Sequence, residues 1–384
     1  MNAPALKLRS KSISSNILCQ YPSGSLCKCL EISWLVVIVL TEVSCKASIP
    51  SSPFFYICVA QDGHGNDESS RPLQTGRARV STDRATTNPK PNKGQVLIQV
   101  KAFGLNRSEL FTRQGLSPNV KLPRILGIEA VGLIHEAPGG EFQNGDVVAT
   151  CMGGLGREVD GGYAEYTLVK AEYARVIETK APWNVLGALP EMLQTSWGAL
   201  NRNLKIQAGE TLLIRGGTTS VGLAAAAIAK SQGLTVVATT RRADREKLLR
   251  SSGVDHVVID NGSVMEKVKA IYTDGVDKVL ELVGSTLPDS VRCAKKGGTI
   301  CQVGVVGGNN NSDLRSALPA GATYGFYAGE QEDFHAMPLQ ELVKQVVDGT
   351  LPVQIGRTFH IDEIVEAHRT MEQNTAGGKI VVLT

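Results

Sequence analysis

The chain has 384 residues, which is enough for two domains with hydrophobic cores, and 42% apolar with 20% charged residues is typical of a folded globular protein. Its 40 Lys and Arg residues are nearly balanced by 37 Asp and Glu residues, which leaves a net charge of +3 and no basic run longer than a pair such as Arg241 and Arg242. The balance argues against a nucleic-acid-binding protein, and the composition excludes disorder over the whole chain.

The N-terminal part differs in character from the rest. It holds five of the eight cysteines without a C-x-x-C pair, so we expect neither a disulfide framework nor a zinc site there. The apolar run from Ile32 to Leu40 is about half of the roughly 20 residues that span a bilayer, so we expect no membrane span, with a signal anchor as the alternative. Residues 61–92 are rich in Gly, Ser, Asn, Asp and Pro, as in a linker. We predict that residues 1–77 form a disordered or non-homologous extension.

Short strand patterns follow. Residues 94–105 alternate as in a half-buried strand, and residues 122–170 contain further strand patterns separated by glycine-containing turns. The pattern predicts a small β barrel or sandwich. Strand patterns return at the C-terminus, so we expect residues 78–185 and 326–384 to form one β domain together.

Between these parts the pattern changes to alternating strands and helices. From Thr211 onward, apolar strand segments are separated by amphipathic or alanine-rich helical segments. Repeated βα units of this kind predict a parallel, doubly wound sheet with helices on both faces. We therefore predict an α/β protein in which residues 186–325 form a Rossmann-type dinucleotide-binding domain.

The first βα unit carries a glycine-rich turn. Gly217 and Gly222 can take the outer glycine positions of the dinucleotide fingerprint, and Thr219 with Ser220 takes the middle, where hydroxyl groups could bind phosphate; Val221 belongs to the same turn. The turn follows a strand and opens a helix, whose N-terminus favours an anion. This context predicts a dinucleotide site.

The end of the second strand indicates which dinucleotide is bound. An acidic residue there usually meets a free ribose 2′-OH, and a basic residue meets a 2′-phosphate. The chain has Thr240, Arg241 and Arg242, with no acidic residue before Asp244. One arginine alone could be ordinary surface, but two beside a hydroxyl predict NADP(H).

Several motifs resemble the medium-chain dehydrogenase/reductase superfamily, in its zinc-independent quinone oxidoreductase and enoyl reductase branch. They occur in the family's order between Pro89 and Thr384, and they read LPRILGIEAVGLI, GDVVAT, GGYAEYTLV, LPEMLQTSWGAL, IRGGTTSVGLAAAAIAK and GGKIVVL. The resemblance implies a GroES-like catalytic domain beside the Rossmann domain. Zinc alcohol dehydrogenases have Cys where this chain has Asn106 and His where it has Ile128, so we expect no bound metal.

The resemblance also implies site residues. Asn106 would face the cleft and donate a hydrogen bond to the acceptor, Glu109 lies one helical turn along, and Thr195 matches a threonine near the nicotinamide. Lys379 matches the family's closing lysine, with a structural and a cofactor-facing role equally open. The strand ends and a family segment add further cofactor contacts at Val283, Gly284, Gly304, Val305, Phe326 and Tyr327.

These expectations combine into one function. Without a Lewis acid, the natural reaction is hydride transfer from NADPH to a quinone or an α,β-unsaturated carbonyl compound. The alternatives are a non-catalytic NADPH-binding protein of crystallin or sensor type, a relative of the zinc alcohol dehydrogenases, and a protein anchored by its N-terminal segment. We expect a cytoplasmic protein with a small-molecule partner and neither nucleic-acid nor membrane partners; the sequence leaves its assembly open, a homodimer included.

Overall fold

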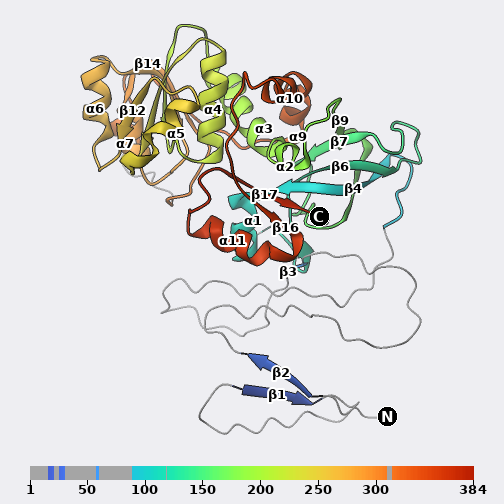
Figure 1. Ribbon diagram of the computed structural model, residues 1–384. Helices are drawn as coiled ribbons and strands as arrows, with labels where there is room; N and C mark the ends of the chain where they lie inside the picture. The colour runs from blue at the N-terminus through green and yellow to red at the C-terminus, as the bar shows by residue number, and fades with distance from the viewer. Residues whose placement is uncertain (1–15, 21–25, 31–57, 60–88, 118, 309–313) are drawn as a thin grey trace.

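The computed structural model describes residues 16–20, 26–30, 58–59, 89–117, 119–308 and 314–384 (Figure 1). Most of the predicted N-terminal extension, the apolar run at residues 32–40 included, lies outside the described residues. Within it, β1 (Asn16–Gln20) and β2 (Leu26–Leu30) pair antiparallel, and β3 (Cys58–Val59) pairs with β5 (Arg124–Ile125).

A seven-stranded sheet forms the β domain. Its order is β16-β17-β4-β6-β7-β9, and β8 also pairs with β4. The C-terminal strand β17 pairs antiparallel with β4, so the end of the chain completes the sheet that residue 95 begins. The strands are β4 (Gln95–Gly104), β6 (Glu129–Glu136), β7 (Val147–Cys151), β8 (Tyr166–Lys170), β9 (Ala174–Val176), β16 (Ile355–His360) and β17 (Lys379–Leu383).

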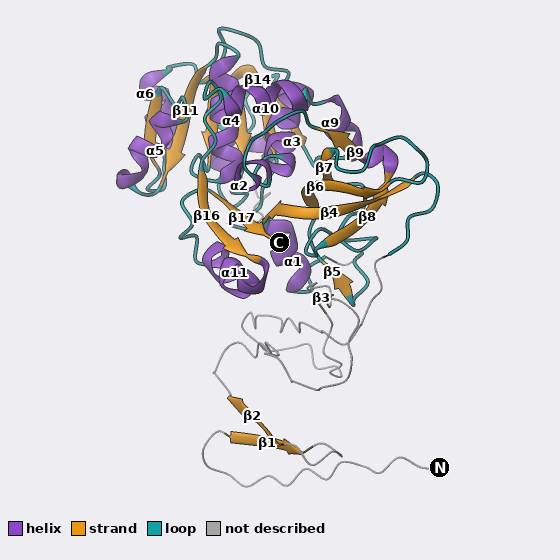
Figure 2. Cartoon of the chain, turned by 45° about the vertical axis from the view of Figure 1, so that its right-hand side comes forward, coloured by secondary structure: helices purple, strands orange, loops and turns teal. Residues whose placement is uncertain are grey.

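A six-stranded parallel sheet with flanking helices forms the second domain (Figure 2). The order β12-β11-β10-β13-β14-β15 reverses direction at β10, which confirms the predicted doubly wound fold. Its strands are β10 (Thr211–Arg215), β11 (Thr235–Thr240), β12 (His256–Ile259), β13 (Val276–Glu281), β14 (Ala294–Gln302) and β15 (Thr323–Phe326). Its helices are α4 (Ser220–Ser231), α5 (Glu246–Ser251), α6 (Val264–Ile271), α7 (Leu287–Val291) and α8 (Leu314–Ala317).

The two sheets share one hydrophobic cluster. Ala102 and Val131 of the β domain belong to the same buried cluster as Leu193 of α3 and Leu223 of α4. Helix α3 lies at the junction of the two sheets in Figure 1. The remaining helices are α1 (Arg107–Arg113), α2 (Trp183–Leu186), α3 (Pro190–Gly198), α9 (Gln331–Ala336), α10 (Leu339–Val347) and α11 (Ile364–Glu372). Among the described residues, no helix has both the length and the hydrophobicity to cross a membrane.

Helix α11 places a neutral histidine inside the β domain. His368 is buried, its ring lies 5.8 Å from the ring of Tyr163, and its Nδ1 has no hydrogen-bond partner among the residues that the structure describes. Burial, together with the positive charge of Arg113, lowers the pKa of His368 from 6.5 to about 3. The folded protein therefore keeps this ring uncharged at neutral and mildly acidic pH.

Replacing His368 by glutamine should make the protein less sensitive to acid. Between pH 6.5 and about 3 the unfolded chain binds a proton on this ring and the folded protein does not, so stability falls as the pH falls. The difference in unfolding free energy between wild type and variant should shrink by about 1.4 kcal/mol per pH unit below 6.5. Urea unfolding at pH 7 and pH 5 measures it, with the exposed His335→Gln as the control. A difference that does not change with pH would contradict the assignment.

Candidate active site

Five side chains form a buried polar group beside α3, which we call the carboxylate cluster: Asn106, Glu109, Glu129, Glu191 and Lys379. Asn106 is the N-cap of α1 and Glu109 lies in the first turn of that helix. Glu129 begins β6, Glu191 lies in the first turn of α3, and Lys379 begins β17. The sheet and the two helix starts thus bring together residues that are far apart in the chain.

Lys379 is the cation of this cluster. Its Nζ donates to Glu129 Oε1 at 2.9 Å and to Asn106 Oδ1 at 2.5 Å, and lies 3.6 Å from Glu191 Oε2. Burial disfavours the charged amine, but the nearby carboxylates, Glu129 first, outweigh it and raise the pKa of Lys379. The lysine therefore stays charged and its role in this structure is within the cluster.

Among the described residues, no cation forms an ion pair with Glu109. Its Oε1 accepts a hydrogen bond from the Ile128 amide at 3.0 Å, and its Oε2 accepts one from the Asn106 amide at 2.9 Å. Burial is the largest influence on this carboxyl, and with the charge of Glu129 it raises the pKa of Glu109 to about 7 despite these hydrogen bonds. Three carboxyl groups and one ammonium thus share the cluster, and the carboxyl group of Glu109 is partly protonated near neutral pH.

The side-chain amide of Asn106 is engaged inside the cluster. Its Nδ2 donates to Glu129 Oε1 at 2.8 Å and approaches Glu109 Oε1 at 3.4 Å, and its Oδ1 accepts from Lys379. In this conformation Asn106 joins the two glutamates to the lysine. Its predicted hydrogen bond to an acceptor molecule stays a prediction.

Thr195 lies between the carboxylate cluster and the glycine-rich turn. Its Oγ1 donates to Glu191 Oε1 at 2.8 Å. The next residue, Ser196, donates to the carbonyl oxygen of Val221 at 3.1 Å, at the start of α4. Helix α3 therefore connects the carboxylates to the expected cofactor turn.

The positions that hold zinc in the alcohol dehydrogenases carry Asn106 and Ile128. The nearby Cys151 is buried and donates through Sγ to Gln194 Oε1 at 3.6 Å, and burial is the main reason why its pKa is raised well above the usual range. Among the described residues, no group of three His, Cys, Asp or Glu side chains is arranged to hold a metal ion. This residue set does not fit a catalytic zinc.

The glycine-rich turn connects β10 to α4. Gly216 has φ of +88°, a left-handed conformation that favours glycine, so the tight turn lies one residue before the predicted Gly217. A Cβ on Gly222 would come within 2.7 Å of the Gly216 carbonyl oxygen, so the third glycine allows α4 to pack close to the turn. Gly217 itself faces Ala238 of β11.

Thr219 caps helix α4. Its Oγ1 accepts from the Gly222 amide at 3.0 Å and donates to the Gly216 carbonyl at 2.9 Å. The hydroxyl, which we expected to bind phosphate, thus stabilises the turn in this structure. Ser220 and Val221 are the first residues of the helix, where amide groups lack intrahelical acceptors and can bind an anion.

The predicted basic pair follows β11. Thr240 is buried at the strand end, and its Oγ1 accepts a hydrogen bond from the Arg242 amide at 3.2 Å. The side chains of Arg241 and Arg242 are exposed, and Arg242 Nε lies 3.0 Å from Asp244 Oδ1. Arg241 is thus open to a ligand, while Arg242 is held by its neighbour.

The ends of β13 and β14 carry the other predicted cofactor contacts. Val283 and Gly284 donate their amides to the buried Glu281 Oε1 at 2.7 and 2.9 Å, which shapes this loop. Gly304 and Val305 follow β14 at the same carboxyl edge of the sheet. Glu281 is a positioning residue that the sequence analysis did not select.

The segment at residues 326–327 shows two different environments. Phe326 ends the edge strand β15 with 58% of its surface exposed. Tyr327 is buried against Gly198, and its hydroxyl donates to Asp333 Oδ2 at 3.0 Å. Tyr327 therefore packs on the end of α3, and a contact of either residue with a cofactor stays a prediction.

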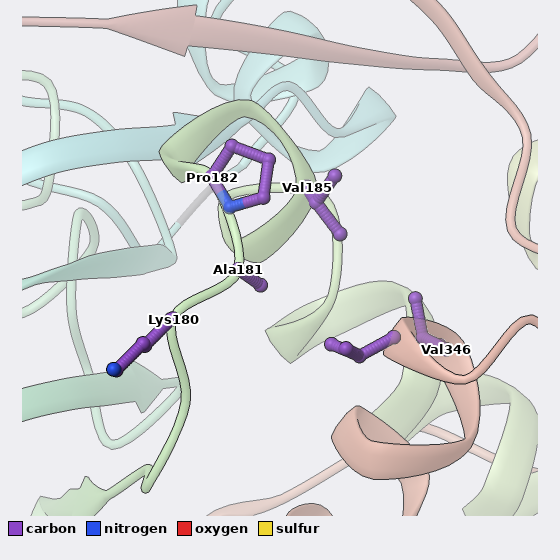
Figure 3. A pocket seen from close by; sticks show the side chains of 6 residues that line it. Lys180, Ala181, Pro182, Val185 and Val346 are labelled. Carbon is purple, nitrogen blue, oxygen red and sulfur yellow. The ribbon is translucent and has the colours of Figure 1, made fainter.

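A separate hollow lies between α2 and α10 (Figure 3). It has a volume of about 350 Å³ and a largely apolar lining. It shares no residue with the carboxylate cluster or the glycine-rich turn. Its lining residues are Lys180, Ala181, Pro182, Val185, Val346 and Val347.

The family matches of the chain agree with its two-domain architecture. Residues 92–180 match the alcohol dehydrogenase GroES-like domain, and residues 220–344 match a family described as zinc-binding dehydrogenase. The latter description names a metal that the residues at positions 106 and 128 do not fit.

Two enzyme classes appear among the relatives. The chain is 29% identical over 308 residues to the quinone oxidoreductase of Pongo abelii, covering 77% of this chain and 91% of the relative. It is 26% identical over 328 residues to the acryloyl-coenzyme A reductase of Metallosphaera sedula, covering 78% and 96%.

Solved structures show the same fold. Escherichia coli quinone oxidoreductase complexed with NADPH superposes with a TM-score of 0.70 at 21% identity, covering 78% of this chain and 94% of that one. The protein AibC gives a TM-score of 0.72 at 23% identity, covering 86% and 95%. Two family domains in the expected order, these relatives and this fold together mean that the chain belongs to the medium-chain dehydrogenase/reductase superfamily.

Proposed function

We propose that the protein is an NADPH-dependent reductase of quinones or α,β-unsaturated carbonyl compounds and that it works without zinc. Two features found together carry the proposal. The chain has a dinucleotide-type turn with the exposed Arg241 beyond the next strand, and it has Asn106 and Ile128 at the positions where zinc alcohol dehydrogenases have metal ligands. The relatives named quinone oxidoreductase and acryloyl-coenzyme A reductase support the same reaction class. We assign residues 78–185 and 326–384 to the catalytic domain and residues 186–325 to the cofactor domain.

The residues at the carboxyl edge of the parallel sheet fit NADP(H). The close approach at Gly222 and the cap at Thr219 keep the start of α4 compact, so its first amides can meet a pyrophosphate. Arg241 and Arg242 supply positive charge where a 2′-phosphate would lie. When bound, the cofactor supplies the hydride.

To reduce the acceptor molecule, the protein has to position it and donate one hydrogen bond to it. A quinone or enone is already electrophilic, so the protein has to hold its reacting carbon close to the hydride donor and stabilise the oxygen on which negative charge develops. The hydroxyl of Thr195 lies at the junction between the cluster and the turn and is our candidate for this bond. Asn106 and Glu109 position it through the carboxylate cluster.

A panel assay tests the proposal. Consumption of NADPH is followed by absorbance with quinones, enones and enoyl thioesters as acceptors, and NADH serves as the comparison cofactor. We expect turnover with at least one of these classes and a preference for NADPH. Tight NADPH binding without turnover on any acceptor would instead favour a non-catalytic NADPH-binding protein.

Metal removal should leave this activity unchanged. Neutral Asn106 and Ile128 cannot replace a thiolate and an imidazole as zinc ligands, so chelators should neither slow the reaction nor destabilise the protein. Elemental analysis of the purified protein is the companion measurement. One zinc per chain, with activity lost on chelation, would overturn the zinc-independent mechanism.

A further inference from the structure

Glu191 is the carboxylate of the cluster that reaches the protein surface. Its side chain is 15% exposed, whereas Glu129 and Lys379 are at most 1% exposed and Glu109 is equally buried. Thr195, its hydrogen-bond partner, is 8% exposed. Protons can therefore enter the cluster from water at Glu191.

The carboxyl groups of Glu129 and Glu191 are not equally stabilised by hydrogen bonds. Glu129 accepts from Lys379 at 2.9 Å, from Asn106 at 2.8 Å and from the Glu191 amide at 2.9 Å, so it is the better hydrogen-bonded carboxylate and pairs directly with the lysine. Glu191 has the longer 3.6 Å approach to Lys379 and one hydroxyl donor, Thr195. The geometry thus leaves Glu191 the less stabilised anion of the two.

The surroundings of Glu191 also favour its protonated form. Burial is the largest influence, and together with the charge of Glu129 it raises the pKa of Glu191, against the effect of Lys379. Glu109 belongs to the same cluster and also has a raised pKa, but its side chain is buried. Lys379 is therefore the ammonium that limits how far the pKa of Glu191 rises.

Thr195 is well placed to pass a proton toward the cofactor side. It follows Glu191 by one helical turn on α3, and its neighbour Ser196 touches the first residues of α4. A hydroxyl can accept a proton from a carboxylic acid while it donates its own. The pair thus connects the partly exposed carboxyl of Glu191 to the region where the acceptor would bind.

We propose that Glu191 holds the proton that Thr195 delivers to the oxygen of the reduced acceptor. This inference rests on the proposed reductase function. Bound NADPH would supply the hydride for the new C–H bond, and the Thr195 O–H bond would break as the new O–H bond forms on the acceptor. Thr195 regains a proton from the carboxyl of Glu191, and Glu191 regains one from water. One NADPH and one solvent proton are consumed in each turnover.

The Glu191→Gln variant tests the proposal, because glutamine keeps the hydrogen bond to Thr195 but cannot deliver a proton in this way. We expect kcat to fall by about 100-fold, the lower end of the range for general acid catalysis. In the wild type, kcat should fall as the pH rises through the pKa of Glu191, and this limb should disappear in the variant. NADPH affinity, measured by fluorescence titration, should not change.

A titration without cofactor supplies an independent readout. Protein labelled with ¹³C at the glutamate carboxyl carbon should show carboxyl signals that titrate above the usual glutamate range. One of them should be absent from Glu191→Gln. If no such signal is lost, Glu191 does not hold the proton and the proposal is overturned.

Thr195 offers a second test that does not depend on Glu191→Gln folding. Thr195→Val removes the hydroxyl at constant shape and should lower kcat as Glu191→Gln does, while Thr195→Ser should lose less. The double variant Thr195→Val/Glu191→Gln should be no slower than the slower of the two single variants. The matched control is Glu266→Gln, an exposed glutamate in the first turn of α6.

The outcomes separate this inference from the proposed function. A wild type that reduces no quinone or enone contradicts the function itself. A wild type that is active, with an unchanged rate and pH profile in Glu191→Gln and an unchanged rate in Thr195→Val, overturns only the proton route. Additive losses in the double variant would show that the two residues act separately, and would also overturn the route.

Discussion

Replacing Lys379 by methionine should lower the free energy of unfolding by about 3–5 kcal/mol, the usual cost of removing one partner of a buried ion pair. The ammonium is buried and bonds Glu129 directly, with Glu191 3.6 Å away. Methionine fills similar space but leaves Glu129 without its cation in a region closed to water. Urea unfolding of wild type and variant at pH 7 measures the loss.

A compensating substitution distinguishes charge from packing. In Lys379→Met/Glu129→Gln the uncompensated carboxylate is gone, so this double variant should recover a large part of the lost stability. The exposed Lys296→Met is the control for the substitution itself and should change little. If Lys379→Met were as stable as the control, the buried ion pair would not be a stabilising contact.

The fold was largely predictable because its signals are local. Apolar strands alternating with helices indicate a parallel doubly wound sheet wherever they occur, and the structure confirms that sheet from β10 to β15. The return of strand patterns at the C-terminus also predicted correctly that β17 would join the first sheet. Each inference needed only the residues of one element and its neighbours.

The presence of the glycine-rich turn between β10 and α4 was predicted from the sequence, but the roles of its individual residues were not. The position of the glycines identified the dinucleotide motif, yet the left-handed residue is Gly216, and the Thr219 hydroxyl caps α4. A sequence of two adjacent glycines does not say which of them turns the chain. Side-chain hydroxyls near a helix start can equally bind a phosphate or the helix amides.

The carboxylate cluster could not be read from the sequence as a unit. Asn106 and Lys379 are hydrogen-bonded although 273 positions separate them. Glu129 lies inside a recognised motif, and Glu191 follows Pro190 at the start of a helix, where an acidic residue is common for helix-dipole reasons alone. Neither glutamate stood out until the tertiary structure placed both beside one lysine.

Removing both Arg241 and Arg242 should weaken NADPH binding by about 2–4 kcal/mol, which is roughly a 30- to 1,000-fold rise in Kd. Each guanidinium would make charge-assisted hydrogen bonds to the 2′-phosphate, and both lie exposed beyond the end of β11. NADH lacks that phosphate, so its affinity should hardly change. Fluorescence titration with both cofactors measures the two effects on one protein.

The single variants should differ from each other because the two arginines have different neighbours. Arg242 is paired with Asp244 and must exchange that partner for the phosphate, whereas no acidic residue in the described part of the chain pairs with Arg241, so Arg241→Ala should cost more affinity than Arg242→Ala. For the same reason Asp244→Asn should tighten NADPH binding by freeing Arg242. The exposed Arg292→Ala, on the same domain, controls for loss of positive charge alone. Equal weakening of NADPH and NADH in the double variant would mean that these arginines do not recognise the 2′-phosphate and that the cofactor preference must come from another part of the site.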